Sequence, residues 1–376
     1  MTCAPFMILV GGLLGAQLAP SSKLATLPVA AMILGSALFT GIAVYVLKRL
    51  GRKRGSYVGI ALALVGTGLG MCSTLWQSFN LLLGAAFLLG VSLAFAQQYR
   101  FAALESLSDK SNFGLALSVM MAGGILSAFV GPEIGSLGKN WLFPEHDFLG
   151  SFVLLAGVIA LGGVVFSLYR ATTIQVESRD VEARPLIKII RNPVFVVSII
   201  ASSVSYGVMS LVMTATPVNM YELCGYELSD TKEVIQNHIM AMFLPSLIGG
   251  FLMKRMGIGG MMLSGGILYA IMMVVALQGS EYMHFNGALL ALGVGWNFLF
   301  ISGTALLPRS YRPEERFKVQ ATNDVVVFSI QAIGSLGAGW LLFQFGWNTL
   351  VWICVVPIFV AMLASTWFLI KKPLDE

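Results

Sequence analysis

Apolar runs long enough to cross a lipid bilayer recur along almost the whole chain, with short polar breaks between them. A helix rises 1.5 Å per residue, so about 20 apolar residues cross the roughly 30 Å hydrocarbon layer. Backbone polar groups within that layer must be satisfied internally, and a helix does this by itself. The sequence predicts an all-α membrane protein with twelve helices, near residues 1–18, 25–47, 56–77, 80–104, 112–138, 148–169, 192–216, 234–253, 258–279, 284–307, 314–342 and 347–370.

Composition excludes a soluble protein. Of the 376 residues, 57% are hydrophobic and 11% are charged, whereas a soluble domain carries about 25% charged residues. The net charge of +5 does not indicate nucleic-acid binding, because no water-exposed basic domain is present to carry it. The four cysteines lack metal-ligand spacing and are interpreted as small apolar residues, at Cys3, Cys72, Cys224 and Cys354.

The first apolar run, 1–18, is interpreted as a short span and not as a signal peptide. It has no basic leader, and Ala19-Pro20 is a poor cleavage site.

The basic residues predict the topology. With both termini in the cytoplasm, 20 of the 23 Lys and Arg residues fall on inner loops or flanks, as the positive-inside rule requires. Only Lys23, Lys139 and Lys232 fall outside. A wrong helix count would disturb this bias after the error, so the distribution favours twelve spans.

The chain divides into two similar halves. A bundle of six helices at 1–170 and another at 192–376 flank a polar linker at 171–191. Leu47-Lys48-Arg49-Leu50-Gly51 is matched by Met253-Lys254-Arg255-Met256-Gly257 at an offset of 206 residues, and Gly90-Val91 by Gly293-Val294 at an offset of 203. Two matches at nearly one offset indicate an internal duplication.

The duplicated helices, the linker and a basic loop between the second and third helices resemble the major facilitator superfamily over the whole chain. Lys48-Arg49-Leu50-Gly51-Arg52-Lys53-Arg54 is similar to that family's loop motif Gly-x-x-x-Asp-Arg-x-Gly-Arg-Lys. Arg49, Gly51, Arg52 and Lys53 match, but Lys48 stands where the motif has Asp. The resemblance implies that these residues belong to a gating loop.

Other segments carry or lack further family features. Gly131-Pro132 partly matches the helix 5 motif of antiporters, and the usual Arg of helix 4 falls near Ala86, which weakens an assignment as a drug antiporter. AFAQQYRFAALES, YGVMSLVMTATP, GVGWNFLF and YRPEERFKVQATND resemble a bacterial branch associated with riboflavin-type vitamin uptake. The family resemblance also implies that helices 1, 4, 7 and 10 line a central cavity.

The fourth predicted helix carries a candidate substrate site. Gln97 and Arg100 lie three residues apart and therefore share a helix face. A charge within a span usually faces the bundle or water, so Arg100 is predicted to hold an anionic or carbonyl group with help from Gln97. The alternative is an arginine that only extends to the interface.

Asp324, in the eleventh predicted helix, lies on one face with Gln320 and Gln331. It could carry a proton, if low dielectric raised its pKa. The family fold offers a second reading, in which Asp324 pairs with Lys48 or Arg49 and locks one state of the transporter. Both readings stay open.

Two more titratable residues are candidates for proton coupling. His238 is the one histidine expected within a span, and its type titrates near neutral pH. Glu133 follows the Gly-Pro break of helix 5 and is expected at the rim of an outer cavity. A purely hydrogen-bonded role is the alternative for each.

Aromatic and amide residues of the predicted cavity helices could stack on and hydrogen-bond a flat organic ligand. They are Gln17, Tyr206, Trp296 and Asn297. Bundle packing is the competing explanation for the aromatic ones.

These features favour a secondary active transporter that moves a small organic solute across the inner membrane by alternating access, coupled to protons. The alternatives are a riboflavin-type vitamin importer and an exporter of amphipathic drugs or metabolites. The chain contains no Walker sequence, so we do not expect it to use ATP directly. We expect no enzymatic activity, cofactor, metal or nucleic-acid partner, and a monomer in the bilayer. A membrane enzyme would need convergent catalytic groups, and a receptor would be expected to have large soluble domains.

Overall fold

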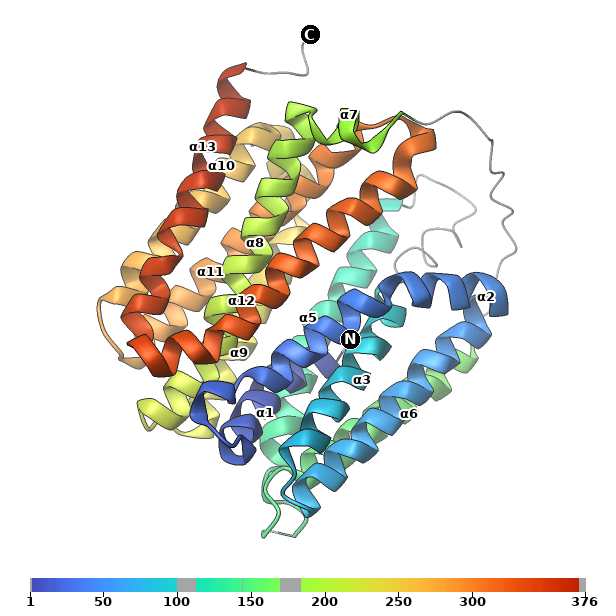
Figure 1. Ribbon diagram of the computed structural model, residues 1–376, viewed down its shortest axis with the longest axis vertical. Helices are drawn as coiled ribbons and strands as arrows, with labels where there is room; N and C mark the ends of the chain where they lie inside the picture. Colours follow the sequence, from blue (N-terminus) through green and yellow to red (C-terminus); the bar gives the residue numbers. More distant parts are fainter. Residues whose placement is uncertain (1, 100–112, 144, 170–183, 372–376) are drawn as a thin grey trace. The chain divides into compact units, whose positions relative to one another are not determined.

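A computed structural model describes residues 2–99, 113–143, 145–169 and 184–371, with the backbone alone for 113–122, 313, 316 and 317. Most of these residues are helical, and none of them forms a strand (Figure 1). The α-helices are α1 (Cys3–Leu18), α2 (Leu27–Leu75), α3 (Phe79–Gln97), α5 (Phe113–Leu137), α6 (Leu149–Ser167), α7 (Leu186–Ile190), α8 (Pro193–Val218), α9 (Leu228–Phe243), α10 (Gly249–Leu277), α11 (Tyr282–Leu306), α12 (Arg316–Ile353) and α13 (Val355–Lys371). The predicted all-α class is confirmed.

Three of these helices contain a kink at a glycine with positive φ. Gly51 in α2 has φ 78° and ψ 157°, Gly257 in α10 has φ 71° and ψ 165°, and Gly346 in α12 has φ 81° and ψ 170°. L-residues with a Cβ rarely adopt this backbone conformation, which glycine tolerates. Gly51 and Gly257 occupy equivalent places in the predicted repeat, so their shared conformation supports the duplication.

Seven helical stretches of the described chain are long and apolar enough to cross a membrane. Two of them, Ser22–Leu75 and Lys318–Lys371, have 54 residues each. A straight helix of that length would extend about 80 Å, far beyond one bilayer, so each accommodates two of the predicted spans, with Gly51 or Gly346 between them. The chain is therefore an integral, multi-pass membrane protein. The count of twelve spans stays a prediction.

The chain forms two compact units, whose boundaries differ from those of the sequence halves. Unit 1 consists of Met1–Ile174, Met213–Gln236 and Ser335–Gln344, and unit 2 of Gln175–Val212, Asn237–Gly334 and Phe345–Glu376. Two short segments that follow the linker thus belong with the first six predicted helices. The six-plus-six division itself remains a prediction about the duplicated sequence.

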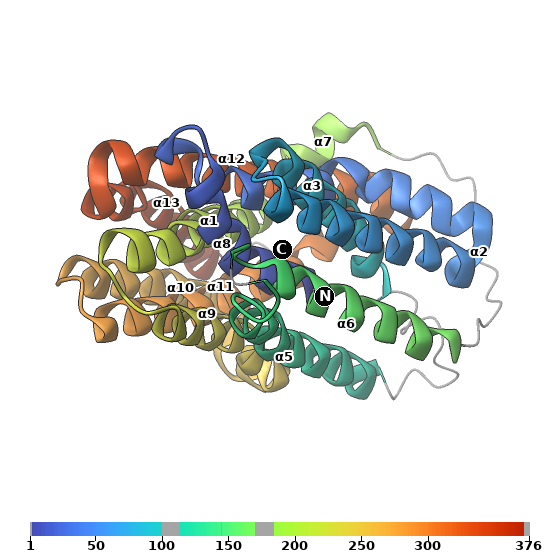
Figure 2. The ribbon, with the colours of Figure 1, turned by 90° about the horizontal axis from the view of Figure 1, so that it is seen from below.

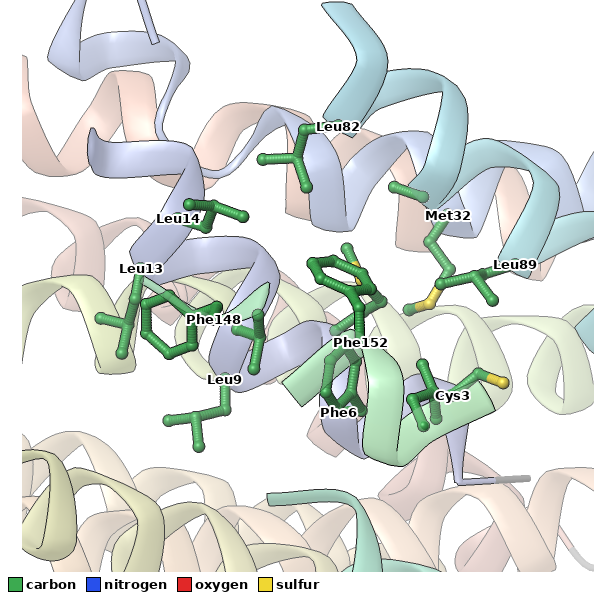
Figure 3. Close-up of a cluster of buried hydrophobic side chains, with 14 of the residues drawn as sticks. Cys3, Phe6, Leu9, Leu13, Leu14, Met32, Leu82, Leu89, Phe148 and Phe152 are labelled. Carbon is green, nitrogen blue, oxygen red and sulfur yellow. The ribbon is translucent and has the colours of Figure 1, made fainter. Parts of the chain in front are cut away.

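In unit 1, α2 packs along α3 and α6, and α1 packs against α2, α3 and α5 (Figure 2). Gly90 of α3 lies so close to the Met32 carbonyl of α2 that a Cβ would collide with it. Buried apolar side chains fill the space around α1, and the rings of Phe6 and Phe152 meet edge to face at 5.3 Å (Figure 3). Since lipid is as apolar as these side chains, close packing is what holds the helices together.

In unit 2, α10 packs along α11 and α13 (Figure 1). Gly293 of α11 faces the His238 carbonyl of α9 at a distance that leaves no room for a Cβ. This contact corresponds to that of Gly90 in unit 1, so both members of the second sequence match lie where two helices approach closely. Hydroxyl groups add hydrogen bonds between helices: Ser198 donates to the Gly303 carbonyl at 2.8 Å and Tyr269 to the Ser205 carbonyl at 2.7 Å.

Candidate functional site

Unit 1 contains two small networks of charged and polar side chains, which we together call the outer cluster after the side of the membrane on which the sequence predicts them. It consists of Gln17, Glu133, Lys139, Asp147, Tyr221, Lys232 and Gln236. Lys232 of α9 donates to a Glu133 carboxylate oxygen of α5 at 2.9 Å. Gln236, one turn later, donates to the Phe129 carbonyl at 3.2 Å and to Glu133 at 3.4 Å. Segments about 100 residues apart are thereby tied together.

Lys139 is the second basic member of the outer cluster. Its Nζ donates to the Tyr221 hydroxyl at 2.7 Å, lies 3.8 Å from an Asp147 carboxylate oxygen, and sits 5.0 Å from the centre of the Tyr221 ring. Gln17, a predicted substrate residue at the end of α1, donates to Asp147 at 3.3 Å. In this structure Gln17 therefore belongs to the network of Asp147, Lys139 and Tyr221.

Sequence reasoning named Gln17 and Glu133 but not their partners. A signal was present nevertheless, because Lys139 and Lys232 are two of the three basic residues that the positive-inside rule leaves on the outer side. If exceptions to that rule had been interpreted as members of ion pairs, Lys139 and Lys232 would both have been identified.

Gln97 lies at the end of α3 and donates to the Ser36 hydroxyl of α2 at 3.2 Å. Its predicted partner Arg100 lies outside the described residues. The pair therefore remains a prediction, with Ser36 as an additional polar group beside it.

Unit 2 contains an aromatic cluster built on Tyr206 of α8 and Trp296 of α11. Their rings meet edge to face at 5.3 Å. The Trp296 ring stacks on Phe300 at 5.1 Å, and Tyr206 also meets Phe300 at 5.1 Å and Phe328 of α12 at 5.9 Å. The structure thus brings together two of the predicted aromatic residues and adds two that the sequence analysis did not name.

Trp296 also leaves a hydrogen-bond donor unused. Its side chain is 5% exposed, and its indole Nε1 is buried without a partner among the described atoms. An unpaired polar group away from water costs free energy, about 1–3 kcal/mol in proteins. A ligand oxygen at this position would remove that cost.

Asn297 and His238 are both fully buried. The Asn297 amide donates to the Met242 carbonyl at 2.7 Å and to the Ser246 hydroxyl at 2.5 Å, while its Oδ1 has no described partner. His238 places Nδ1 2.7 Å from the Leu289 carbonyl and leaves Nε2 unpartnered among the described atoms. Each residue thus joins α9 to α11 with one atom and retains another for a further interaction.

Asp324 lies on α12, partly exposed, and accepts a hydrogen bond from the Asn323 amide at 3.2 Å. Gln320, one turn earlier, donates to the Tyr311 hydroxyl at 2.9 Å. Asp324 and the basic residues Lys48 and Arg49 belong to different units, so the proposed gate pair is not tested.

The predicted gating loop is the kinked part of α2. Arg49 donates to the Tyr45 hydroxyl at 3.1 Å, and Lys53 donates to the Ser167 carbonyl at the end of α6 at 2.6 Å. The latter bond satisfies a carbonyl that the helix end leaves open. Lys48 and Arg52 flank Gly51 and also have interactions of their own. Lys53 thus attaches the kinked part of α2 to α6.

Glu315, in the 3₁₀ turn η6 (Pro313–Glu315) before α12, forms an anchor that the sequence analysis did not identify. It accepts two charge-assisted bonds from Arg184, both at 2.6 Å, and a bond from the Arg312 backbone N–H at 2.9 Å. Hydrogen bonds from Arg184 hold the pKa of Glu315 at about 2. The contribution of this carboxylate to stability is therefore complete above about pH 4.5 and disappears as the pH falls towards 2.

Comparison with known proteins identifies the family. The family model of the Major Facilitator Superfamily matches residues 2–244 and 238–376. The riboflavin transporter RfnT of Brucella anthropi is 35% identical over 374 residues, which cover 98% of this chain and 92% of that protein.

Two uncharacterized MFS-type transporters of Bacillus subtilis, YddS and YdeG, are each 29% identical to this chain. The matches cover 88% and 89% of the chain and 79% and 81% of those proteins. With a family model along almost its whole length and a relative that is 35% identical over nearly its full length, the chain belongs to the Major Facilitator Superfamily of membrane transporters.

Proposed function

We propose that this protein is a secondary transporter for a flat heteroaromatic solute of the riboflavin type. The observation that carries the proposal is the aromatic cluster of unit 2, in which the Trp296 indole N–H is buried without a partner among the residues that the structure describes. Aromatic rings stack on a flat ligand, and one fixed donor selects a ligand with a carbonyl or ring nitrogen at its edge. The similarity to a protein named as a riboflavin transporter supports the same solute class.

The proposed substrate site combines residues of the predicted cavity helices. Tyr206 and Trp296 of unit 2 supply stacking surfaces, and Asn297 supplies an acceptor through Oδ1. Gln97 and Arg100 of the first half are further candidates for polar contacts with the substrate. Transport then follows from alternating access, in which the two sides of the membrane open in turn. The sequence contains no Walker motif, and we propose that an ion gradient drives the cycle.

Glu133 is the residue that we propose couples transport to protons. Protonation would remove its negative charge and weaken its bond to Lys232, and with it the tie between α5 and α9. An outer proton would therefore favour opening of the segments that the outer cluster holds together. His238 and Asp324 remain second candidates. His238 has a buried nitrogen with no partner in the described part of the chain, and Asp324 is an acid on a membrane helix.

The protein is proposed to act as a monomer in the inner membrane, with both termini in the cytoplasm. The distribution of basic residues supports this orientation, since it assigns the outer cluster to the outer side.

Uptake by purified protein in liposomes tests the proposal. We expect saturable accumulation of labelled riboflavin when the outside is more acidic than the inside, and its loss on addition of a protonophore. Riboflavin should also raise the apparent melting temperature of the protein in detergent, because a ligand that binds the folded state stabilises it. Glucose serves as the matched non-aromatic control. The absence of both riboflavin binding and riboflavin uptake would refute the solute class. Uptake that does not depend on the pH gradient would refute proton coupling.

A further inference from the structure

Unit 2 also contains a groove that shares no side chain with the aromatic cluster. It has a volume of about 440 Å³ and is bordered by the first turns of α10, the 3₁₀ turn η5 (Leu307–Ser310) and the end of α13. Its basic members are Lys254 and Arg309, and its apolar wall includes Met253, Ile258 and Phe368.

The two basic side chains are available for a ligand. Both are exposed, and neither forms an ion pair or hydrogen bond with any residue in the described ranges. The buried acid Glu315 is already bound by Arg184. The groove therefore presents two positive charges that no described side chain neutralises, and such charges favour an anionic occupant.

The backbone keeps the groove open at Gly257. This residue adopts φ 71° at the kink of α10, and a Cβ added there would have no atom within 4 Å. One residue later Ile258 is buried, and Gly259 packs closely against Phe368 and Leu369 of α13. The floor and one wall are thus fixed by helix packing, whereas the basic side is open.

The surroundings place the groove at the boundary between lipid and water. Exposed apolar side chains of the same helices flank it, including Phe251 and Ile370. Lys371 lies in the last turn of α13, one turn beyond Phe368. Exposed apolar and basic side chains occur together where a helix leaves the hydrocarbon layer, and the predicted topology assigns this end to the cytoplasm.

We propose that this groove binds the head group of an anionic phospholipid of the inner leaflet. Its phosphate would lie between Lys254 and Arg309, and the upper part of an acyl chain would lie against Phe368. Basic pockets between membrane helices on the cytoplasmic side suit such head groups. A free phosphate would satisfy the charges but leave the apolar wall without a partner, which is why we assign a lipid.

Native mass spectrometry of the full chain in detergent tests this site. The probes are phosphatidylglycerol, phosphatidylcholine of the same chain length, and glycerol phosphate, which carries the charge without acyl chains. We expect retention of phosphatidylglycerol over phosphatidylcholine and no retention of glycerol phosphate. The double variant Lys254→Gln/Arg309→Gln should weaken phosphatidylglycerol binding roughly 30-fold, with each single variant intermediate.

Lys318→Gln is the matched control, because Lys318 is an exposed basic residue of unit 2 that does not line the groove. Its binding should equal that of the unchanged protein. Equal retention by the double variant and the control would overturn the site. Equal retention of the two phospholipids would overturn the anionic head group, and retention of glycerol phosphate would overturn the lipid. Elution at the monomer position in size-exclusion chromatography, expected because both residues are exposed, confirms that each variant is folded.

Discussion

The two units use their polar side chains in different ways. In unit 1 the outer cluster contains both signs of charge, and its acids and bases bind one another: Glu133 with Lys232, and Asp147 with Lys139. In unit 2 the polar groups beside the aromatic cluster are uncharged, and Trp296 and Asn297 each keep a buried atom without a described partner.

This difference indicates a division of roles. Paired charges add little beyond holding two segments together, and they can be released by a proton. Unpartnered uncharged donors and acceptors in an aromatic setting cost stability unless a ligand completes them. This contrast supports our proposal that the outer cluster of unit 1 serves opening and proton coupling and that the aromatic cluster of unit 2 recognises the substrate.

The largest effect should come from Trp296. Trp296→Ala removes both the stacking surface and the indole donor, and should weaken riboflavin binding roughly 10- to 100-fold. Trp296→Phe keeps a ring and loses the donor, so a roughly 3- to 10-fold loss is expected. Isothermal titration measures both. Trp352→Ala, which removes an exposed tryptophan of the same unit, should bind normally. Normal binding by Trp296→Ala would remove the recognition role of unit 2.

The ion pair of unit 1 should give an intermediate effect. Glu133→Gln removes the carboxylate that binds Lys232. A partly exposed ion pair contributes about 1 kcal/mol, so the fraction of molecules with the outer cluster closed, relative to those with it open, should fall about fivefold. Cysteines at Phe129 and Gln236, in a background where the native cysteines are serine, would report this as a lower yield with a short bifunctional maleimide. The charge-reversed double variant Glu133→Lys/Lys232→Glu should restore the yield. If the single variant cross-links as before, the pair does not hold these segments.

A feature shared by both units should give equal effects in each. Gly90→Ala and Gly293→Ala place a methyl group against a backbone carbonyl of the neighbouring helix, and each should cost about 1–3 kcal/mol of stability. The controls are Gly84→Ala and Gly287→Ala in the same two helices, where a Cβ meets its nearest atom at 3.8 Å and 3.4 Å. Melting temperatures should fall for the first two variants and change little for the controls. A loss in one unit alone would argue that the duplicated contact is not equivalent.

The smallest effect concerns Cys224, which is exposed and belongs to unit 1, whereas Cys354 of unit 2 is buried. A membrane-impermeant maleimide added to intact cells should label Cys224 and leave Cys354 unmodified. Neighbouring atoms remove part of the water around the Cys224 thiol, and this desolvation raises its pKa above the ordinary value. The reactive thiolate fraction should therefore keep rising, about tenfold per pH unit, between pH 7 and 9. Labelling only after the cells are broken would reverse the predicted orientation.

Sequence patterns predicted much of the fold because the bilayer imposes them. The apolar runs predicted helices, and α2, α10 and α12 contain their kinks at glycines in or beside the predicted breaks, as at Gly51 and Gly346. The site was predicted less completely. Tyr206 and Trp296 do lie together, but Phe300 and Phe328 were not recognised as members, because apolar aromatics in a membrane helix look alike in sequence.

By itself the sequence determined that the protein is embedded in a membrane and consists of helices. Unsatisfied backbone groups and charged side chains are too costly in hydrocarbon, so long apolar runs with few charges must form membrane helices. Only the tertiary structure decided which polar groups meet. Glu133 binds Lys232, 99 residues away, and Lys139 binds Tyr221, 82 residues away. Such contacts depend on how helices pack against one another, and helix periodicity within one segment carries no information about a partner in another.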